Sequence, residues 1–382
     1  MVILEEPYAS PLLVEWLASS RHPVLDNGFA RSASASSALN LVPAAECARR
    51  LSSGERVYTC SENALSWICD NVDNPELVRV INLLKDKAAL RELLSPLNPD
   101  LYFRTFSREQ LGDVAVEDLP LPVVLKPTVG FCSMGVYVIE CAEDWNRALS
   151  DIEASASVWN GRYPESVVDA GDYIVEGFAD GDEYAVDMYY DAEGKARVLN
   201  VLRHDFAGPE DTSDRMYVTS RDIVLEMGPL LSRWLDAANA YIGARDFPAH
   251  VEVRVKEGRV VPIEFNPLRF AGLGGTDVAY LGWGLRTYAA YLEDEKVDLD
   301  SMTAGASGKV YSMSLLNPSP AADLRRPLDY DALKERFSNV LALHRFDVDV
   351  TGSYGFLFLE TDASCADELD FLLHSDLTEF LR

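Results

Sequence analysis

Residues 121–140, LPVVLKPTVGFCSMGVYVIE, place a glycine-containing loop between two apolar, β-branched runs. The runs are Val123–Leu125 and Val136–Ile139, and a loop of this kind between them predicts a β-hairpin. Gly130 and Gly135 have the spacing of a P-loop, but no Gly-Lys-Ser/Thr follows, and the next segment has the pattern of a strand. A phosphate site at a helix N-terminus is therefore excluded for this segment.

A loop joining two strands can still cover phosphate groups. Its glycines allow backbone amides to approach oxygen atoms closely, and Ser133 adds a hydroxyl donor. Lys126, at the end of the first run, supplies a positive charge. An ordinary hairpin with a flexible tip and a solvated lysine explains this segment equally well.

A second hairpin brings two carboxylates together. Residues 250–267 alternate apolar and polar side chains and turn at Gly258, which places Glu252 opposite Glu264. Asn266 shares the face of Glu264, because side chains two residues apart point the same way in a strand. Buried and unpaired, two carboxylates would repel, and a hard divalent cation removes that conflict. Mg²⁺ suits these oxygen ligands, as does Mn²⁺; the alternative is an exposed hairpin with solvated acids.

Two further segments carry polar residues in a suggestive order. Residues 173–187 predict a strand that ends at Glu176, a turn, and a second strand that opens at Glu183. Backbone groups of such a crossing segment could contact an adenine edge, with acids on either side for its amino group and for ribose hydroxyls. Arg269, in the glycine-rich segment after the second hairpin, suits an anionic substrate or is simply a surface arginine.

Composition excludes several classes of protein. The chain has 34 Lys and Arg against 62 Asp and Glu, a net charge of −28, which disfavours nucleic acid and anionic membranes as partners. We find no signal-peptide pattern, no apolar window long enough for a membrane helix, and no CxxC or zinc pattern among the six cysteines. These features predict a cytoplasmic protein with reduced thiols, in which a phosphate-bearing ligand needs a local cluster of positive groups or a metal.

The remaining pattern predicts mixed helices and strands. Two helices broken near Lys85 are expected over residues 76–94, and a long amphipathic helix over 222–243 ends at Gly243. Towards the C-terminus the pattern predicts three strands and a final helix: residues 310–315, 340–350, 354–360 and 365–381.

Taken together and in this order, the segments resemble the ATP-grasp superfamily, most closely its carboxylate–amine (amino acid) ligase type. The resemblance covers residues 80–285 and rests on the combination of LLKDKAALRELL, LKPTVGFCSMGVYVI, VEGFADGDEYAVD and HVEVRVKEGRVVPIEFNP. It implies an α+β fold in which two α+β subdomains grip a nucleotide. The implied division is an α/β domain before the grasp (1–82), a lid subdomain (83–172), a subdomain with the metal site (173–300) and a short α+β segment (305–382).

The resemblance also implies roles for particular residues. Those assigned to ATP are Lys87, Lys126, Gly130, Ser133, Gly135, Glu176, Phe178, Ala179 and Glu183; those assigned to the metal are Glu252, Glu264 and Asn266. His250 and Arg269 would contact the reacting groups. Many relatives have an arginine two residues after the asparagine, whereas here Arg269 follows it by three. Arg203 and Arg215 are further candidates for phosphate or substrate contacts.

The implied activity is that of an ATP-dependent ligase, which joins a carboxylate to an amine through an acyl phosphate and gives ADP and phosphate. An ATP-dependent phosphotransferase and a nucleotide-binding protein without turnover are the alternatives. The sequence does not identify the acid or the amine. We expect residues 305–382 to complete the substrate wall or a contact in a homodimer.

Overall fold

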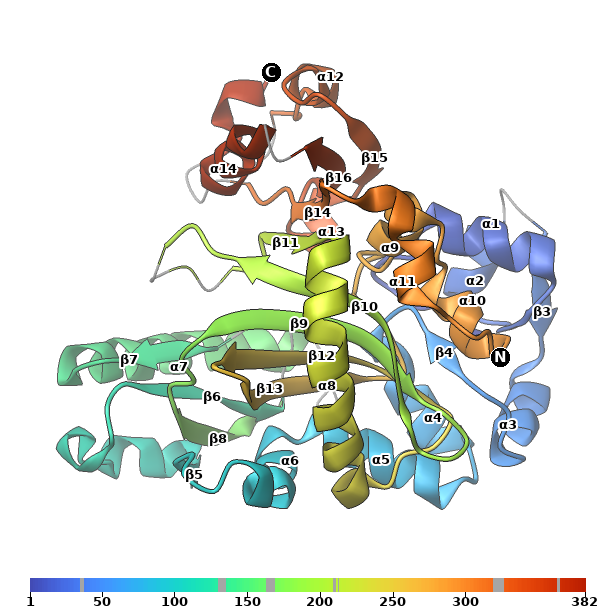
Figure 1. The fold of residues 1–382 in the computed structure, drawn as a ribbon. Coiled ribbons are helices and arrows are strands. Elements are labelled where there is room, and N and C mark those ends of the chain that lie inside the picture. The colour runs from blue at the N-terminus through green and yellow to red at the C-terminus, as the bar shows by residue number, and fades with distance from the viewer. Residues whose placement is uncertain are drawn as a thin grey trace.

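Three β-sheets organise the chain (Figure 1). The computed structural model describes residues 1–34, 38–129, 135–162, 169–208, 211, 213–318, 326–362 and 365–382. Helices cover the sheets, and among these residues no helix is long and apolar enough to cross a membrane. The architecture is mixed α+β, as predicted.

The first sheet is small and parallel. Its strands run in the order β3-β2-β1-β4, and helices connect them: β1 (Val2–Ile3), α1 (Pro11–Ser20), β2 (Pro23–Leu25), α2 (Gly28–Ala33), β3 (Asn40–Val42), α3 (Ala44–Ser52) and β4 (Tyr58–Thr59). The parallel strands need crossover connections, which these helices supply. After β4 follow the 3₁₀ turn η1 (Glu62–Ala64), whose first amides are capped by Ser61, and α4 (Leu65–Asn71).

Two helices then lead to the second sheet. α5 (Pro75–Lys85) and α6 (Lys87–Leu94) are separate, as predicted, because the Asp86 side chain accepts from the amides of Ala88 and Ala89 and so caps α6. The antiparallel lid sheet follows after η2 (Ser95–Leu97), with η3 (Arg108–Asp113), η4 (Val116–Asp118) and α7 (Ala142–Arg162) around it. Its strands run in the order β5-β8-β6-β7: β5 (Phe103–Ser107), β8 (Asp169–Gly177), β6 (Val123–Val129) and β7 (Tyr137–Ile139).

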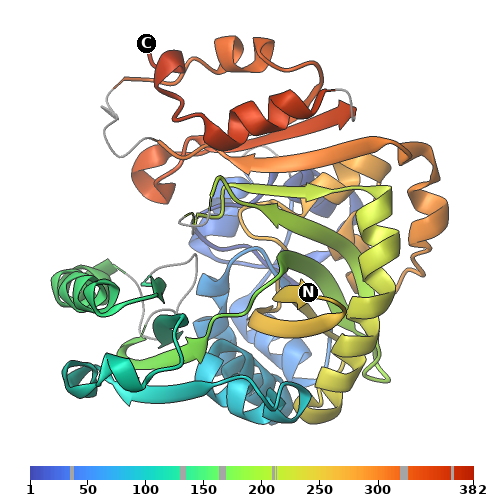
Figure 2. The ribbon, with the colours of Figure 1, turned by 60° about the vertical axis from the view of Figure 1, so that its left-hand side comes forward.

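The predicted first hairpin is confirmed within the lid sheet. Val123 pairs with Ile139 and Leu125 with Tyr137 across β6 and β7. The inner side chains pack against Trp145 of α7 and form a core separate from that of the larger sheet. Figure 2 shows the lid sheet and α7 standing out to one side of the molecule.

The third sheet is antiparallel and has eight strands, in the order β13-β12-β9-β10-β11-β14-β16-β15. Their bounds are β9 (Asp182–Tyr190), β10 (Ala196–Asp205), β11 (Met216–Thr219), β12 (Phe247–Lys256), β13 (Arg259–Pro267), β14 (Lys309–Leu315), β15 (Val340–Arg345) and β16 (Gly355–Asp362). α8 (Arg221–Ile242) packs on one face and ends, as predicted, at Gly243, whose φ is 75°. Short helices follow β13: α9 (Asp277–Trp283), α10 (Thr287–Leu292), α11 (Leu299–Met302) and η5 (Ala304–Ala306).

The C-terminal strands extend this same sheet, because β14 pairs with β11 on one side and with β16 on the other. The strand predicted over 340–350 ends at Arg345: Asp347 caps α13 (Val348–Thr351), which turns at Gly352. The helix predicted over 365–381 is shorter, α14 (Ala366–His374), and is followed by η7 (Thr378–Phe380). α12 (Tyr330–Glu335) completes this region. The four-part division of the chain stays a prediction.

Candidate active site

A cavity of about 620 Å³ lies where the lid sheet, α6 and the eight-stranded sheet meet. Ten of the predicted site residues line it: Lys87, Lys126, Glu176, Phe178, Ala179, Glu183, His250, Glu252, Glu264 and Arg269. Asn266 is buried and donates its amide Nδ2 to Glu264 Oε1 at 3.0 Å. Gly135 has a φ of 71°, in the left-handed region. Gly130 and Ser133 lie outside the described residues.

One end of the cavity holds a buried cluster of charge. Lys126 Nζ lies 2.7 Å from Glu176 Oε2, and Arg91 Nε donates to Glu176 Oε1 at 2.6 Å. Burial alone would raise the pKa of Glu176, but Lys126 and Arg91 outweigh it and lower that pKa to about 2. Burial, which Glu176 offsets only in part, lowers the pKa of Lys126. One carboxylate therefore faces two cations, and an anionic ligand would reduce the excess of positive charge.

A bulge in β13 helps to hold these cations. The pairing of β12 with β13 shifts by one residue just before Glu264, which makes Ile263 the extra residue. The carbonyls of Pro262 and Ile263 accept from Arg91 Nη2 at 2.5 Å and Lys126 Nζ at 3.4 Å. The strand that carries Glu264 is thus bonded to both α6 and the lid sheet.

The predicted carboxylate pair is present. Glu252 of β12 is directly opposite Glu264 of β13, and Lys87 Nζ lies 3.0 Å from Glu264 Oε2. Burial would raise the pKa of Glu264, yet Lys87 outweighs it and lowers that pKa to about 2. No lysine or arginine of the described residues forms an ion pair with Glu252. Burial, with Glu264 and Asp214 nearby, raises its pKa well above the ordinary value, and Arg269 offsets this only in part.

These donors suit a hard divalent cation. Two carboxylates and the amide of Asn266 supply oxygen atoms, and the unneutralised Glu252 is the group that a cation would relieve. Among the described residues, no three His, Cys, Asp or Glu side chains are grouped as a ready-made metal site.

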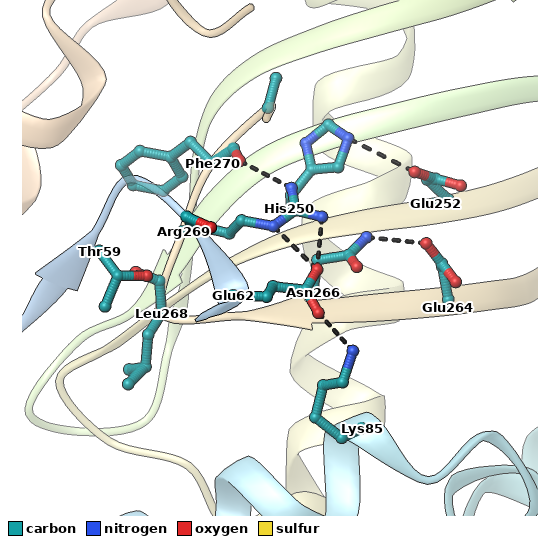
Figure 3. Close-up of polar contacts among 12 residues, drawn as sticks. Thr59, Glu62, Lys85, His250, Glu252, Glu264, Asn266, Leu268, Arg269 and Phe270 are labelled. Carbon is teal, nitrogen blue, oxygen red and sulfur yellow. Dashed lines mark hydrogen bonds and ion pairs between the residues drawn. The ribbon is translucent and has the colours of Figure 1, made fainter. Parts of the chain in front are cut away.

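His250 is held by a carboxylate that the sequence did not single out. Its Nδ1 donates to Asp187 Oδ1 at 2.7 Å, and its Nε2 lies 3.6 Å from Glu252 Oε1 (Figure 3). Asp187 is fully buried and also accepts from the Ala271 amide at 2.8 Å and from Thr276 Oγ1 at 2.6 Å. The imidazole therefore has a fixed orientation, with Nε2 towards the cavity.

Arg269 is held by a carboxylate from the N-terminal region of the chain. Its Nε and Nη2 donate to Glu62 Oε1 at 2.9 and 2.6 Å, and Lys85 also contacts Glu62 (Figure 3). Burial would raise the pKa of Glu62, but Lys85 and Arg269 lower it to about 2. Leu268, the residue two after Asn266, is buried with a φ of 60°, and this left-handed turn leaves Arg269 to reach the cavity.

Comparison with known proteins agrees with this geometry. Residues 119–277 match the family model of the ATP-grasp domain. This chain contains an ATP-grasp domain. No curated protein was found to match the chain by sequence.

Solved structures share the fold over almost the whole chain. An L-amino acid ligase from Bacillus licheniformis is 17% identical with a TM-score of 0.72, and the match covers 100% of this chain and 97% of that one. An N5-carboxyaminoimidazole synthase from Aspergillus clavatus, in complex with ADP and 5-aminoimidazole ribonucleotide, is 15% identical with a TM-score of 0.64, over 99% and 97%. A biotin carboxylase from Campylobacter jejuni is 12% identical with a TM-score of 0.61, over 94% and 87%. At these identities the matches show the ATP-grasp fold alone.

The ATP-grasp cavity also contains residues that sequence reasoning missed. Glu183 accepts from His204 Nδ1 at 2.8 Å and from Arg254 Nη2 at 2.8 Å, and the Arg254 guanidinium lies 5.7 Å from the Phe178 ring centroid. The Phe178 amide donates to the Pro122 carbonyl at 3.1 Å. Strand alternation could have suggested Arg254, two residues after Glu252, but His204 lies on β10, a strand whose pairing was not predicted.

Arg203 and Arg215 do not line the ATP-grasp cavity. Arg203 pairs with Asp205 at 2.6 Å, because its neighbour His204 takes the face of β10 that lines the cavity. Arg215 donates to the carbonyls of Leu372 and Ser375 and so ties the C-terminal region to β11. Their contact with phosphate or substrate therefore stays a prediction, and Asp214, next to Arg215 in sequence, lines the cavity.

Proposed function

We propose that this ATP-grasp protein is an ATP-dependent ligase that joins a carboxylate to an amine and releases ADP and phosphate. The single observation that supports it most is a series of neighbouring polar side chains in the cavity, which runs from a lysine through two carboxylates to a histidine. Lys87 contacts Glu264, Glu252 lies opposite Glu264, and His250 lies next to Glu252. Phosphates at one end and a carboxylate at the other would thus share one cation site.

The proposed reaction has two steps. A carboxylate oxygen of the first substrate attacks the γ-phosphorus of ATP, the bond to ADP breaks, and an acyl phosphate forms. The amine nitrogen then attacks the acyl carbon, loses its proton, and phosphate leaves with the electrons of the C–O bond. Bound Mg²⁺ or Mn²⁺ would withdraw charge from the phosphates, held by Glu252, Glu264 and Asn266.

The chain's own residues would position these groups. Lys87 and Lys126 would face phosphate oxygens, and Phe178, Ala179 and Glu183 would hold the adenosine. Arg269, fixed by Glu62, would hold the substrate carboxylate. His250 would contact the acyl phosphate through Nε2, while Asp187 accepts from Nδ1 and so fixes the orientation of the ring. Such a site lowers the barrier through positioning and electrostatics.

The test is ADP and phosphate release from ATP and Mg²⁺ with a panel of acids, each with and without amines. Hydroxylamine should trap the acyl phosphate, and an amide should form only when an amine is present. ADP formation that no amine changes, with a stable phosphorylated product, would favour a phosphotransferase. ATP binding without ADP formation across the panel would favour a nucleotide-binding protein without turnover.

A further inference from the structure

The ATP-grasp cavity has two apolar ends, and only one of them suits a nucleotide. The first, beside Phe178, comes from the lid sheet and its neighbours: Pro122, Val124, Val138, Phe178 and Val261. The second, which we call the distal wall, comes from the C-terminal half of the eight-stranded sheet and one loop: Tyr217, Leu273, Met313, Leu315 and Phe356. None of the five residues of the distal wall carries a formal charge.

Strand register explains why the distal wall is apolar. Met313 and Leu315 are two residues apart on β14 and therefore share one face. Met313 is opposite Tyr217 of β11, and Leu315 is opposite Phe356 of β16. Cross-strand neighbours on one face lie close enough to form a continuous surface. Three strands thus present a single apolar patch to the cavity.

The side chains of the distal wall are tightly packed against their neighbours. Met313 and Phe356 are only 4% and 5% exposed, and the Phe356 ring centroid lies 5.5 Å from that of Phe346 in an edge-to-face contact. A Cβ on Gly275 would lie 2.8 Å from Met313, so the loop backbone packs directly against the methionine. A surface with so little room keeps its shape when a ligand binds.

A loop also links the distal wall to the reacting groups. Leu273 belongs to the segment that follows Arg269, and the Ala271 amide in that segment donates to Asp187, the carboxylate that holds His250. The wall is therefore in the same cavity as the groups that we assign to the carboxylate, and a bound molecule can touch both.

We infer that the distal wall binds an apolar side chain of the acid or amine substrate, so that one substrate is an amino acid with an apolar side chain. This inference rests on the proposed function, because only that function makes the bound molecule a substrate. The phosphates match the charged middle, and the adenine matches the first apolar end. The distal wall is thus left for the second molecule, and burying apolar surface there is favourable.

A cationic side chain is the competing occupant. Asp214 lines the cavity next to the wall and accepts from the Tyr217 hydroxyl at 3.1 Å, and Asp211 lines it as well. These carboxylates lie at the edge of the apolar patch, whereas an apolar side chain would cover Met313, Leu315 and Phe356 themselves. Lysine therefore has to be included in any binding comparison.

Calorimetry in the presence of ADP and Mg²⁺ tests the inference without turnover. The probes are L-leucine, L-phenylalanine, L-lysine and L-glutamate, titrated into the full chain and into Leu315→Ala and Phe356→Leu. We expect leucine or phenylalanine to bind most tightly, and the wall variants to weaken that binding about 10-fold. ADP affinity should not change. Val350→Ala is the matched control, because Val350 is 56% exposed and does not line this cavity.

The inference is overturned if lysine or glutamate binds more tightly than both apolar amino acids, or if the wall variants bind leucine and phenylalanine as well as the wild type does. Binding of none of the four probes would overturn it too. Because these are binding measurements, apolar selectivity without any ADP release would leave the inference standing and count against the proposed ligase alone. Leu315 is only partly buried and Phe356→Leu is conservative, so both variants should fold.

Discussion

The two apolar ends of the cavity are built in different ways. The end beside the lid takes Val124 and Val138 from a single hairpin, whereas the distal wall takes Tyr217, Met313 and Phe356 from three strands that are far apart in sequence. Local pairing builds the first, and long-range pairing builds the second. The apolar part of a nucleotide site of this kind can therefore be specified by one short sequence segment. The substrate contacts depend on several distant strands, and substitutions in any one of them can alter those contacts separately.

Charge separates the two ends further. At the nucleotide end each described lysine has an acidic neighbour: Lys126 lies beside Glu176, and Lys87 beside Glu264. In the distal wall no side chain carries a formal charge. Substitutions at the nucleotide end should therefore change both the stability of the protein and its affinity for ATP. Substitutions in the distal wall should change only the affinity for the other substrate.

The largest expected effect is at Glu176. Glu176→Gln leaves Lys126 and Arg91 buried without their carboxylate, and removing one partner of a buried charge cluster costs about 3–5 kcal/mol of unfolding free energy. Chemical denaturation measures this. Glu360→Gln, which breaks a partly exposed pair with Lys309, is the control and should cost at most about 1 kcal/mol. Equal losses in the two variants would contradict the conclusion that Glu176 is the centre of a buried charge cluster on which the fold depends.

The same carboxylate predicts a pH dependence. The folded pKa of Glu176 is about 2 against an ordinary value of 4.5, so its stabilising contribution is complete above about pH 4.5 and is lost as pH falls towards 2. Glu62 and Glu264 have the same direction of shift. Unfolding free energy should therefore fall steeply with acid over this window, and less steeply in Glu176→Gln than in the wild type.

Glu252 should show the opposite balance between activity and stability. Glu252→Gln removes a carboxylate that we propose as a cation ligand, and ATP turnover should fall about 10²–10³-fold, as when one electrostatic contact to a transition state is lost. Stability should be unchanged or higher, because the neutral amide avoids both the burial of a charge and the repulsion from Glu264 that raise the pKa of Glu252. Steady-state ADP release and denaturation of the same sample check both. Full turnover in this variant would remove Glu252 from the metal site.

These residues show how far sequence reasoning reached. The pairing of Glu252 with Glu264, the lid hairpin and the break between α5 and α6 were predictable, because each depends on residues within one short segment. Asp187 and Glu62 were not, because each meets its partner only after distant strands and domains pack. Strand alternation also gave no way to know that His204, rather than Arg203, faces the cavity.

Gly355 tests the distal wall through its backbone. Its φ is 150°, and a Cβ there would lie 2.1 Å from the His344 carbonyl oxygen, so Gly355→Ala should cost about 3 kcal/mol and displace the adjacent Phe356. The KM of the second substrate should rise, and the KM of ATP should stay the same. Gly352→Ala is the control: its φ is 76° with nothing within 4 Å, and about 1 kcal/mol is expected. A rise in both KM values in Gly355→Ala would mean that the ends are not independent.

The smallest expected effect, that of Phe178→Leu, gives the sharpest test of whether the two ends of the cavity bind separate ligands. Phe178 is 38% exposed and its ring lies 5.7 Å from the Arg254 guanidinium, so Phe178→Leu removes a cation–π contact at the nucleotide end. That contact is worth about 0.5–1 kcal/mol, and because its loss frees Arg254 and reshapes the proposed adenine site, we expect the KM of ATP to rise about 2- to 5-fold. Phe356→Leu makes the same chemical change at the distal wall and should raise only the KM of the second substrate. If either variant changed both constants equally, one continuous apolar surface, rather than two ends with separate ligands, would line the cavity.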